Sequence, residues 1–432
     1  MKFPALRKQW RRRIEERPHT PATMKILWVK AGPLVPLNAG GRIRSWNILK
    51  NLGQWDEVTL LTYSPSYVGT HQEGVPEHVA KLISLEFPGP AKYSAGYYLE
   101  YLRLLFSAAP FTVRKTGITS IRLQIEELLR KEHFDIVVAD FLSATLTLPK
   151  KTPCPMILFA HNVETEIWKR HFEVTRSPIR KMVMGIEYLK MRRFEKNPPR
   201  HFDHILTVSE KDREFFSQIL PADEVSVLPT GVDLNFFCPS STPPVPGRLV
   251  FSGSMDWMAN EDAILYFAEA ILPIVAKSVP GVSLTAAGRD PTEPLRKLSK
   301  EDPRIQLTGT VPDIRPHVAA GEVYVVPLRV GSGTRLKIFE AMAMGKAVVS
   351  TRVGAEGLPV VHGEHVLLAD EPEEFANAVV RLLGDKELRG RLGKASHLLV
   401  TEKFGNPAVA KVCHDILARV VEAAHSRNGH RT

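Results

Sequence analysis

Two cations and a carboxylate lie close together in residues 335–344, and their types and spacing suit the binding of a phosphorylated ligand. Thr334 can cap the start of a helix there, and Gly345 can end it. Arg335 and Lys337 would then occupy the first helical turn, where the helix dipole disfavours each cation by roughly 0.3–1 kcal/mol. A bound anion offsets this cost, because the N-termini of helices bind phosphate. The run therefore predicts an anion site.

A carboxylate extends this site. Glu340 follows Lys337 by three residues, so both side chains can point to one side of the helix. A carboxylate beside a phosphate site suits the vicinal hydroxyls of a ribose. The run thus predicts half of a nucleotide-sugar pocket, and the alternative is a surface ion pair between Lys337 and Glu340.

The elements that position this pocket belong to a chain of 432 residues, which is long enough for two domains. Its 44% hydrophobic and 24% charged residues are typical of soluble globular proteins. Of the net charge of +10, residues 1–23 carry +5, from seven Lys and Arg residues against Glu15 and Glu16. The remainder is only mildly basic, which favours an anionic surface or substrate over nucleic acid as the partner.

The basic tail, residues 1–23, has apolar residues at helical spacing: Phe3, Leu6, Trp10 and Ile14. A basic amphipathic helix of this kind can lie on an anionic membrane surface. The alternatives are a disordered basic arm, or a true translation start at Met24.

Cysteine usage and hydropathy indicate the compartment. Cys154, Cys238 and Cys413 are far apart and form no C-x-x-C motif, so we expect no disulfide framework, no cysteine-based metal site and a reducing environment. No apolar run reaches the roughly 18 residues of a membrane span, and the N-terminus has no signal-peptide core. The prediction is a cytoplasmic protein, with peripheral contact at the inner face of the membrane through the tail.

From Met24 onward, short apolar strands alternate with helical patterns, which predicts an α/β fold with two doubly wound, Rossmann-like domains. We expect an N-terminal domain over 24–238, a linker over 239–247, a C-terminal domain over 248–401, and a final segment, 402–432, whose helix packs back on the N-terminal domain. The strands are expected at 26–29, 58–61, 136–138, 157–159, 205–208, 249–251, 282–285, 305–307, 323–326 and 347–349. Two such domains place the carboxyl ends of their strands against one cleft.

Two common nucleotide motifs are missing from the sequence. No G-x-G-x-x-G follows the first strand, and Gly393-Lys394 lacks the remaining residues of a Walker A motif. The sequence therefore lacks the main motifs that would support a dinucleotide dehydrogenase or a P-loop enzyme.

Three segments together resemble the retaining glycosyltransferases of the GT-B fold, glycosyltransferase family 4 (group 1). They are Val-Ser-Glu at 208–210, Leu-Pro-Thr-Gly-Val-Asp at 228–233, and the run from Gly-Thr-Arg-Leu-Lys through Glu-Ala-Met-Ala-Met-Gly-Lys-Ala-Val-Val-Ser-Thr to Gly at 333–354. The resemblance covers most of residues 24–420 and implies two Rossmann-like domains that face a cleft.

The resemblance assigns roles around the opening helix. Glu340 matches the second Glu of the family's E-x7-E motif, which binds the donor ribose, whereas Ser332 stands where the first Glu is expected. Ser332 cannot supply that charge, so the sugar-side contacts depart from the family pattern. Arg335 and Lys337 correspond to a diphosphate clamp and are the expected catalytic cations. Gly333 and Thr334 complete the turn against the donor.

Further donor contacts follow from the same resemblance. Gly253 and Ser254 occupy the position of the family's phosphate loop, and Arg289 follows a glycine turn, where solvation is its alternative role. Gly40 and Gly41 resemble a glycine loop that lets backbone amides approach the donor, with a plain tight turn as the alternative. The nearby Asn260 is expected to be a helix N-cap and not a ligand.

Acceptor-side residues are expected in the N-terminal domain. His161 ends a strand, so it should lie at the edge of the cleft, where relatives contact the donor sugar. We expect it to be a catalytic residue together with Arg335 and Lys337; a structural histidine is the alternative. Glu164 could bind acceptor or begin the next helix. The aromatic stretch 93–111 and the basic stretch 176–200 are either packed core with a solvated face or a site for a lipid-linked acceptor.

The resemblance implies a hexosyltransferase-type enzyme that moves sugar from a nucleotide-diphosphate sugar to a glycan or lipid-linked acceptor with retention, in cell-surface polysaccharide or glycolipid synthesis. We expect neither metal nor resident cofactor. The alternatives are a GT-B epimerase or nucleotide-sugar hydrolase, and a catalytically degenerate nucleotide-binding scaffold.

Overall fold

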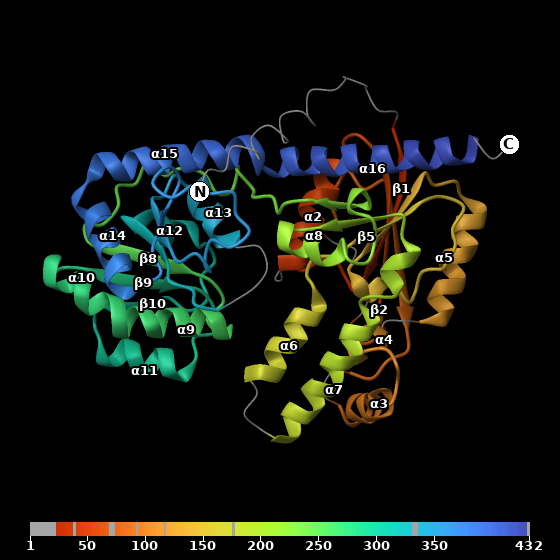
Figure 1. Cartoon of the computed structure of the whole chain (residues 1–432), viewed down its shortest axis with the longest axis horizontal. Helices are drawn as coiled ribbons and strands as arrows, with labels where there is room; N and C mark the ends of the chain where they lie inside the picture. The colour runs from red at the N-terminus through yellow and green to blue at the C-terminus, as the bar shows by residue number, and fades with distance from the viewer. Residues whose placement is uncertain are drawn as a thin grey trace.

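The protein forms two α/β domains that lie side by side (Figure 1). A computed structural model describes residues 23–37, 40–68, 74–91, 94–115, 118–174, 178–330 and 336–429. Residues 1–22 lie outside these ranges, so the expected amphipathic tail stays a sequence-based prediction.

The N-terminal domain is built on a parallel sheet of seven strands in the order β3-β2-β1-β4-β5-β6-β7. In chain order the strands are β1 (Lys25–Ala31), β2 (Glu57–Pro65), β3 (Lys81–Phe87), β4 (Ile136–Asp140), β5 (Met156–Phe159), β6 (His204–Thr207) and β7 (Val225–Val227). Ile26 of β1 pairs with Val58 on one side and Ile136 on the other, so the strand order reverses between β1 and β4. Ligands of doubly wound domains bind beyond the carboxyl ends of the strands at this switch point.

Both faces of this sheet are covered, which explains the continuous apolar strands. Leu27 and Val29 belong to one buried cluster, and Ile26 and Trp28 belong to the other, as the two-residue period of a strand requires. The helices of the domain are α2 (Gly40–Leu52), α3 (Ala95–Leu105), α4 (Phe111–Arg114), α5 (Thr119–Lys131), α6 (Glu164–Val174), α7 (Pro178–Phe194) and α8 (Glu210–Phe216).

The C-terminal domain repeats this design with a parallel sheet of six strands in the order β10-β9-β8-β11-β12-β13. The strands are β8 (Arg248–Ser252), β9 (Ser283–Ala287), β10 (Ile305–Leu307), β11 (Val323–Val326), β12 (Val348–Ser350) and β13 (Leu367–Leu368). The helices are α9 (Met258–Tyr266), α10 (Leu272–Ser278), α11 (Glu293–Glu301), α12 (Arg315–Ala320), α13 (Leu336–Ala343), α14 (Pro372–Gly384) and α15 (Lys386–Lys403). Here the strand order reverses between β8 and β11.

The prediction of a doubly wound α/β fold is confirmed, and every strand expected from the sequence is present. Three strands are additional: β3, β7 and β13, each at an edge of its sheet. An edge strand has one neighbour, and β3 is mostly only half-buried, so its sequence lacks a continuous apolar run.

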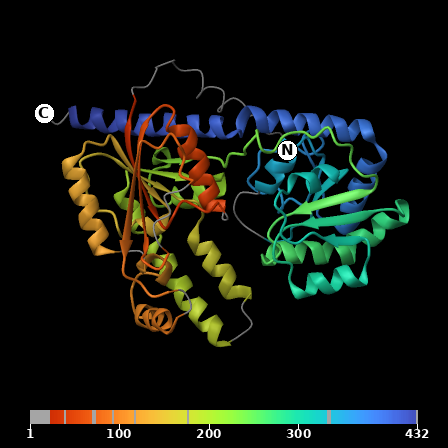
Figure 2. The same ribbon diagram turned by 180° about the vertical axis from the view of Figure 1, so that it is seen from behind.

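The last helix, α16 (Asn406–Gly429), lies against the N-terminal domain (Figure 2). Val409, Cys413 and Leu417 join a buried cluster that includes Ile48 and Leu49 of α2. A buried hydrogen bond, 2.6 Å between His414 Nδ1 and Asp56 Oδ2, ties α16 to the residue before β2. The chain therefore returns from the second domain to complete the core of the first.

The carboxyl edges of the two sheets face the boundary between the domains. Lys211, just beyond β6, lies 3.1 Å from Glu356, which follows β12. A Cβ added to Gly357 would lie 3.6 Å from Ser209. Residues that follow the strands of one domain thus meet those of the other. Within the described ranges, no helix combines the length and apolarity needed to cross a membrane.

Candidate functional site

The structure brings Lys337 and Gly253 together at the switch point of the C-terminal domain. Gly253 directly follows β8, and Lys337 lies in the first turn of α13. Gly253 has φ +152°, and a Cβ there would lie 2.8 Å from Lys337 Nζ. Glycine adopts this backbone conformation readily, and the absence of a Cβ leaves room for the ammonium group beside the loop.

Asn260 holds this arrangement in place, and the prediction that it is an N-cap is wrong. The N-cap position of α9 belongs to Trp257, and Asn260 lies one turn further on. Its Oδ1 accepts a hydrogen bond of 2.7 Å from Lys337 Nζ, and its Nδ2 donates one of 2.7 Å to the carbonyl oxygen of Ser254. Asn260 therefore links the lysine to the loop after β8.

Two further groups lie close to Lys337. Its Nζ lies 3.9 Å from the centre of the Phe251 ring, a cation–π distance. Burial raises the pKa of Glu340 to about 7, and the positive charge of Lys337 acts against this rise. Lys337 and Glu340 are thus neighbours on α13, as the three-residue spacing predicts.

Arg289 lies beside the same loop. Its Nε donates a hydrogen bond of 2.9 Å to Ser254 Oγ, and its side chain is exposed. A Cβ on Gly288 would lie 1.7 Å from the carbonyl oxygen of Gly253, so the loops after β8 and β9 are in direct contact. Gly253, Ser254, Arg289 and Lys337 therefore form one cluster. The other predicted members, Ser332, Gly333, Thr334 and Arg335, lie outside the described residues.

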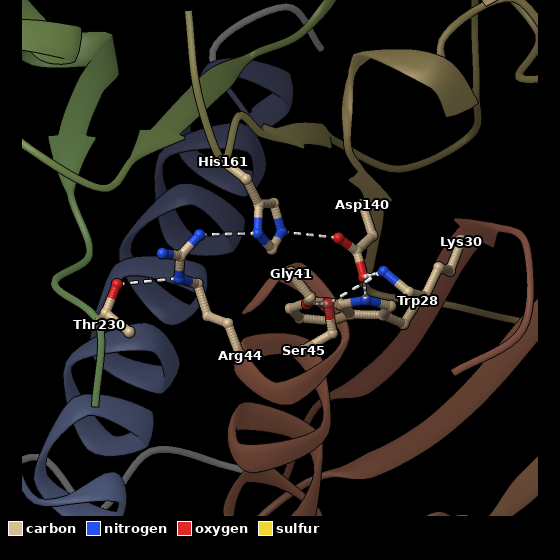
Figure 3. A network of polar contacts seen from close by, with 8 residues as sticks. All are labelled: Trp28, Lys30, Gly41, Arg44, Ser45, Asp140, His161 and Thr230. Carbon is tan, nitrogen blue, oxygen red and sulfur yellow. Dashed lines mark hydrogen bonds and ion pairs between the residues drawn. The ribbon is translucent and has the colours of Figure 1, made fainter. Parts of the chain in front are cut away.

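The N-terminal domain has a buried polar network at its own switch point (Figure 3). It centres on Asp140, the last residue of β4, whose Oδ2 accepts hydrogen bonds of 3.0 Å from Trp28 Nε1 and from Lys30 Nζ. Its Oδ1 lies 2.8 Å from His161 Nε2. Burial acts to raise the pKa of Asp140, but Lys30 and His161 hold it below its usual range.

Arg44 fixes the tautomer of His161. The guanidinium can only donate, so His161 Nδ1, at 2.9 Å from Arg44 Nη1, must accept, and Nε2–H donates to Asp140. Burial lowers the pKa of His161 to about 3, so the ring is neutral. Arg44 also donates from Nε to Thr230 Oγ1 at 2.9 Å, which ties α2 to the segment after β7.

The expected position of His161 at the cleft edge needs correction. The residue follows β5 as predicted, but it is 1% exposed, and both ring nitrogens have partners. Its ring also stacks on Phe141, with the ring centres 3.7 Å apart. In this conformation it orients Asp140 and Arg44 beneath the surface, and a direct contact with substrate stays a prediction.

The two glycines at the start of α2 differ in their surroundings. A Cβ on Gly41 would lie 2.3 Å from the Phe141 ring, whereas a Cβ on Gly40 meets nothing within 4 Å. Gly41 thus serves close packing between α2 and Phe141. A backbone contact of either glycine with the donor stays a prediction.

Glu164 begins α6, which was one of its two expected roles. The start of α6 is capped by Glu195, whose two carboxylate oxygens accept hydrogen bonds of 2.7 Å from the Glu164 amide and 2.8 Å from the Thr165 amide. Burial raises the pKa of both carboxyl groups to about 7.

Sequence reasoning missed Lys30, Asp140, Arg44 and the bridging role of Asn260. A signal existed for the first two, because each is a charged residue that directly continues or ends an apolar strand. Within the described residues, no group of three or more His, Cys, Asp or Glu side chains could hold a metal ion.

Two family models match this chain, one on each domain. The model described as Glycosyltransferase Family 4 matches residues 46–236, and the model described as Glycosyl transferases group 1 matches residues 246–385. The chain belongs to the group 1, family 4 glycosyltransferases. The family that the sequence resembles is thereby confirmed, whereas retention at the anomeric carbon stays a prediction.

Named relatives of this glycosyltransferase cover different shares of it. It is 22% identical over 371 residues to an uncharacterized 44.6 kDa protein in the cps region of Klebsiella pneumoniae, which covers 82% of this chain and 90% of that protein. It is 31% identical over 148 residues to the lipopolysaccharide core biosynthesis glycosyltransferase LpsE of Rhizobium meliloti strain 1021. This match covers 32% of this chain and 43% of LpsE. It is 28% identical over 201 residues to a phosphatidyl-myo-inositol mannosyltransferase of Mycolicibacterium smegmatis. This match covers 44% of this chain and 51% of the mannosyltransferase. The match thus spans about half the length of each of the two named transferases.

Solved structures share the fold of this glycosyltransferase over nearly its whole length. Sucrose-phosphate synthase from Thermosynechococcus elongatus superposes with a TM-score of 0.68 at 18% identity, covering 93% of this chain and 100% of that one. Anabaena HepE in complex with UDP superposes with a TM-score of 0.62 at 14% identity, covering 92% and 100%. At such identities the likeness concerns the fold, and it confirms the GT-B arrangement of two Rossmann-like domains.

Proposed function

We propose that this glycosyltransferase moves a hexose from a nucleoside-diphosphate sugar to a glycan or lipid-linked acceptor, with retention at the anomeric carbon. The observation that carries the proposal is the position of Lys337, with its ammonium group against the Gly253 loop at the switch point of the C-terminal domain. A diphosphate at this point would meet the ammonium of Lys337 and the N-terminus of α13. The UDP in the HepE structure and the lipopolysaccharide and phosphatidylinositol relatives support a nucleotide donor and a cell-surface acceptor.

The proposed reaction breaks the bond between the anomeric carbon and the diphosphate oxygen, and it forms a bond from that carbon to the acceptor oxygen on the same face. The departing diphosphate oxygen takes the acceptor proton. Charge accumulates on the diphosphate, so the task of the enzyme is to hold both substrates and to stabilise that charge. Lys337 and Arg335 supply positive charge there, and Glu340 binds the ribose hydroxyls of the donor.

The N-terminal network has a supporting part in this proposal. Asp140, His161 and Arg44 fix the loops after β1, β4 and β5, which face the other domain. A network with defined hydrogen bonds keeps these loops in one arrangement before substrate arrives, and such preorganisation is what a positioning mechanism requires. We place the reaction in the cytoplasm, where nucleotide sugars are supplied, and expect it to need no metal or resident cofactor.

The test is a thermal-stability screen with nucleoside diphosphates and their sugars, followed by assays of Lys337→Ala. A ligand at about 100 times its Kd should stabilise the protein by about 2.7 kcal/mol. Lys337→Ala should weaken this effect and lower kcat about 10²-fold, because it removes a charge that acts on the leaving group. Lys277→Ala, at an exposed lysine on α10, is the matched control and should change neither.

Other outcomes would identify the alternatives. Stabilisation by no nucleotide at all would favour a degenerate scaffold. Consumption of the donor at full rate without any acceptor would favour a hydrolase or epimerase. Wild-type turnover by Lys337→Ala would remove Lys337 from the mechanism.

A further inference from the structure

The helix α3 presents a stripe of apolar side chains to solvent. Leu99 is 70% exposed, and Phe106, directly after the helix, is 91% exposed; Tyr98 and Leu102 are exposed as well. These positions recur at helical spacing, so they share one face. The opposite side of α3 packs inward, since the Tyr101 ring lies 4.5 Å from that of Phe111. The outward stripe is therefore not part of the core, and no residue of α3 is fully buried.

The neighbouring helix α7 carries a second stripe. Ile179, Met182 and Leu189 are exposed and recur at intervals of three and seven residues. The two helices are in contact, because Lys190 Nζ donates a hydrogen bond of 3.0 Å to the carbonyl oxygen of Leu104. A groove of about 640 Å³ between them is lined by residues from both, among them Leu105, Phe106, Ile186, Leu189 and Arg193. The two stripes thus meet at this groove through Phe106 and Leu189, and we call the two stripes together the α3–α7 surface.

The charges around this surface are nearly all positive. The exposed cations are Arg103, Arg180, Lys181, Arg192, Arg193, Lys196 and Arg200. The two acidic residues of the 178–200 segment are buried and bound to backbone amides, Glu187 to that of Phe111 and Glu195 to those of Glu164 and Thr165. Glu100 on α3 is a partly exposed acidic residue. Burial of the carboxylates leaves the basic side chains as the charge that a partner would meet.

We propose that the α3–α7 surface docks on an anionic lipid bilayer. Apolar side chains flanked by Lys and Arg match the two parts of a membrane interface: acyl chains and negatively charged headgroups. Long basic side chains can reach the headgroups while their stems stay against apolar surface. The surface lies at the end of the N-terminal domain that is opposite to α16 in both views (Figures 1 and 2).

The role of this docking rests on the proposed function, because docking by the N-terminal domain would bring the enzyme to a lipid-linked acceptor in the membrane. It differs from the expected role of the basic tail, since it involves folded helices far along the chain from residues 1–23. It also explains why stretches 94–111 and 178–200 expose apolar and basic side chains to solvent although other members, such as Phe111 and Met191, are buried.

The test is sedimentation of the full-length chain with vesicles of phosphatidylcholine alone or of phosphatidylcholine with phosphatidylglycerol. The wild type should bind the anionic vesicles at least tenfold more tightly, and added salt should weaken this binding because it screens the headgroup charge. Leu99→Glu/Leu102→Glu should lower binding to anionic vesicles at least tenfold. The matched control is Leu123→Glu on α5, whose side chain is 57% exposed against 58% for Leu102, and it should bind as the wild type does.

Two further measurements separate the possible failures. Arg11→Ala/Arg12→Ala/Arg13→Ala measures the contribution of the tail; if it abolishes binding while Leu99→Glu/Leu102→Glu has no effect, the proposal is overturned. Sizing by light scattering tests a protein partner: a dimer that Leu99→Glu/Leu102→Glu disperses, without vesicle binding, overturns it as well. Stabilisation by nucleotides should be unchanged in all these variants, so failure of docking is distinguishable from failure of the donor site.

Discussion

Asp140 shows how a single buried residue organises the N-terminal switch point. Its carboxylate accepts hydrogen bonds from β1, through Trp28 and Lys30, and from the residue after β5, His161. A buried carboxylate without partners would be strongly destabilising, so the three donors together compensate the burial of the Asp140 charge. The network therefore couples the positions of three adjacent strand ends.

The neutral state of His161 leads to a prediction for stability against pH. Burial lowers its pKa to about 3, whereas the unfolded value is about 6.5, so between these values the unfolded chain binds a proton that the folded chain does not. Stability should fall as pH decreases through this window, by up to about 1.4 kcal/mol per pH unit from this group. His161→Gln can still accept from Arg44 and donate to Asp140, but it cannot titrate.

We therefore expect the unfolding free energy of the wild type to decrease more than that of His161→Gln as pH falls from 6.5 to 4. Urea denaturation at a series of pH values measures it, and contributions from other titrating groups cancel in the difference. Parallel profiles for the two proteins would mean that His161 is protonated in the folded state.

The two halves of the candidate site differ in how far the sequence predicts them. Lys337 and Glu340 are three residues apart on one helix, so local periodicity is enough to place them together. Asp140 and Arg44 lie 96 positions apart in the numbering, and only the strand order brings them together. Asn260 looks like a helix cap because it precedes two acidic residues, and its contact with Lys337 depends on how α9 and α13 are arranged in space.

At the scale of elements, helix α2 packs so closely on Phe141 that one methyl group decides the fit. A Cβ on Gly41 would overlap the ring, and Phe141 cannot retreat freely because it stacks on His161. We predict that Gly41→Ala destabilises the protein by about 1–3 kcal/mol, the usual range for overpacking. Gly40→Ala, one residue earlier with nothing within 4 Å, should be neutral or stabilising by up to about 1 kcal/mol. Equal unfolding free energies for the two variants, measured in denaturant, would contradict this packing.

The strands show which elements a sequence reveals. Interior strands such as β1 and β11 are covered on both faces, so they appear as continuous apolar runs. The edge strands β3, β7 and β13 are not predicted from the sequence because they are short or half-buried. Each pairs with a neighbour on one side only, and the local sequence does not specify that neighbour.

At the scale of the whole molecule, α16 joins the two domains from the far end of the chain. It follows α15 of the C-terminal domain, yet Val409, Ile416 and Leu417 are buried in the core cluster of the N-terminal domain. Each fully buried side chain of this size contributes about 1.5–3 kcal/mol. The N-terminal domain therefore depends on a segment that follows the whole C-terminal domain in the chain. Any relative movement of the domains must be accommodated both between β7 and β8 and at the short connection between α15 and α16.

Cysteine reactivity can report whether α16 stays docked. Cys413 lies on the face of α16 that is buried against the N-terminal domain, and burial raises the pKa of its thiol. Cys238, in contrast, is exposed. We predict that a maleimide labels Cys238 rapidly and Cys413 at least 10²-fold more slowly, because only the exposed thiolate reacts. His414→Ala removes the contact with Asp56 and should speed the labelling of Cys413, whereas Asp415→Ala, at a half-exposed ion pair on the same helix, should not. Mass spectrometry of the labelled peptides measures each rate; similar rates for Cys238 and Cys413 in the wild type would show that α16 leaves the N-terminal domain readily in solution.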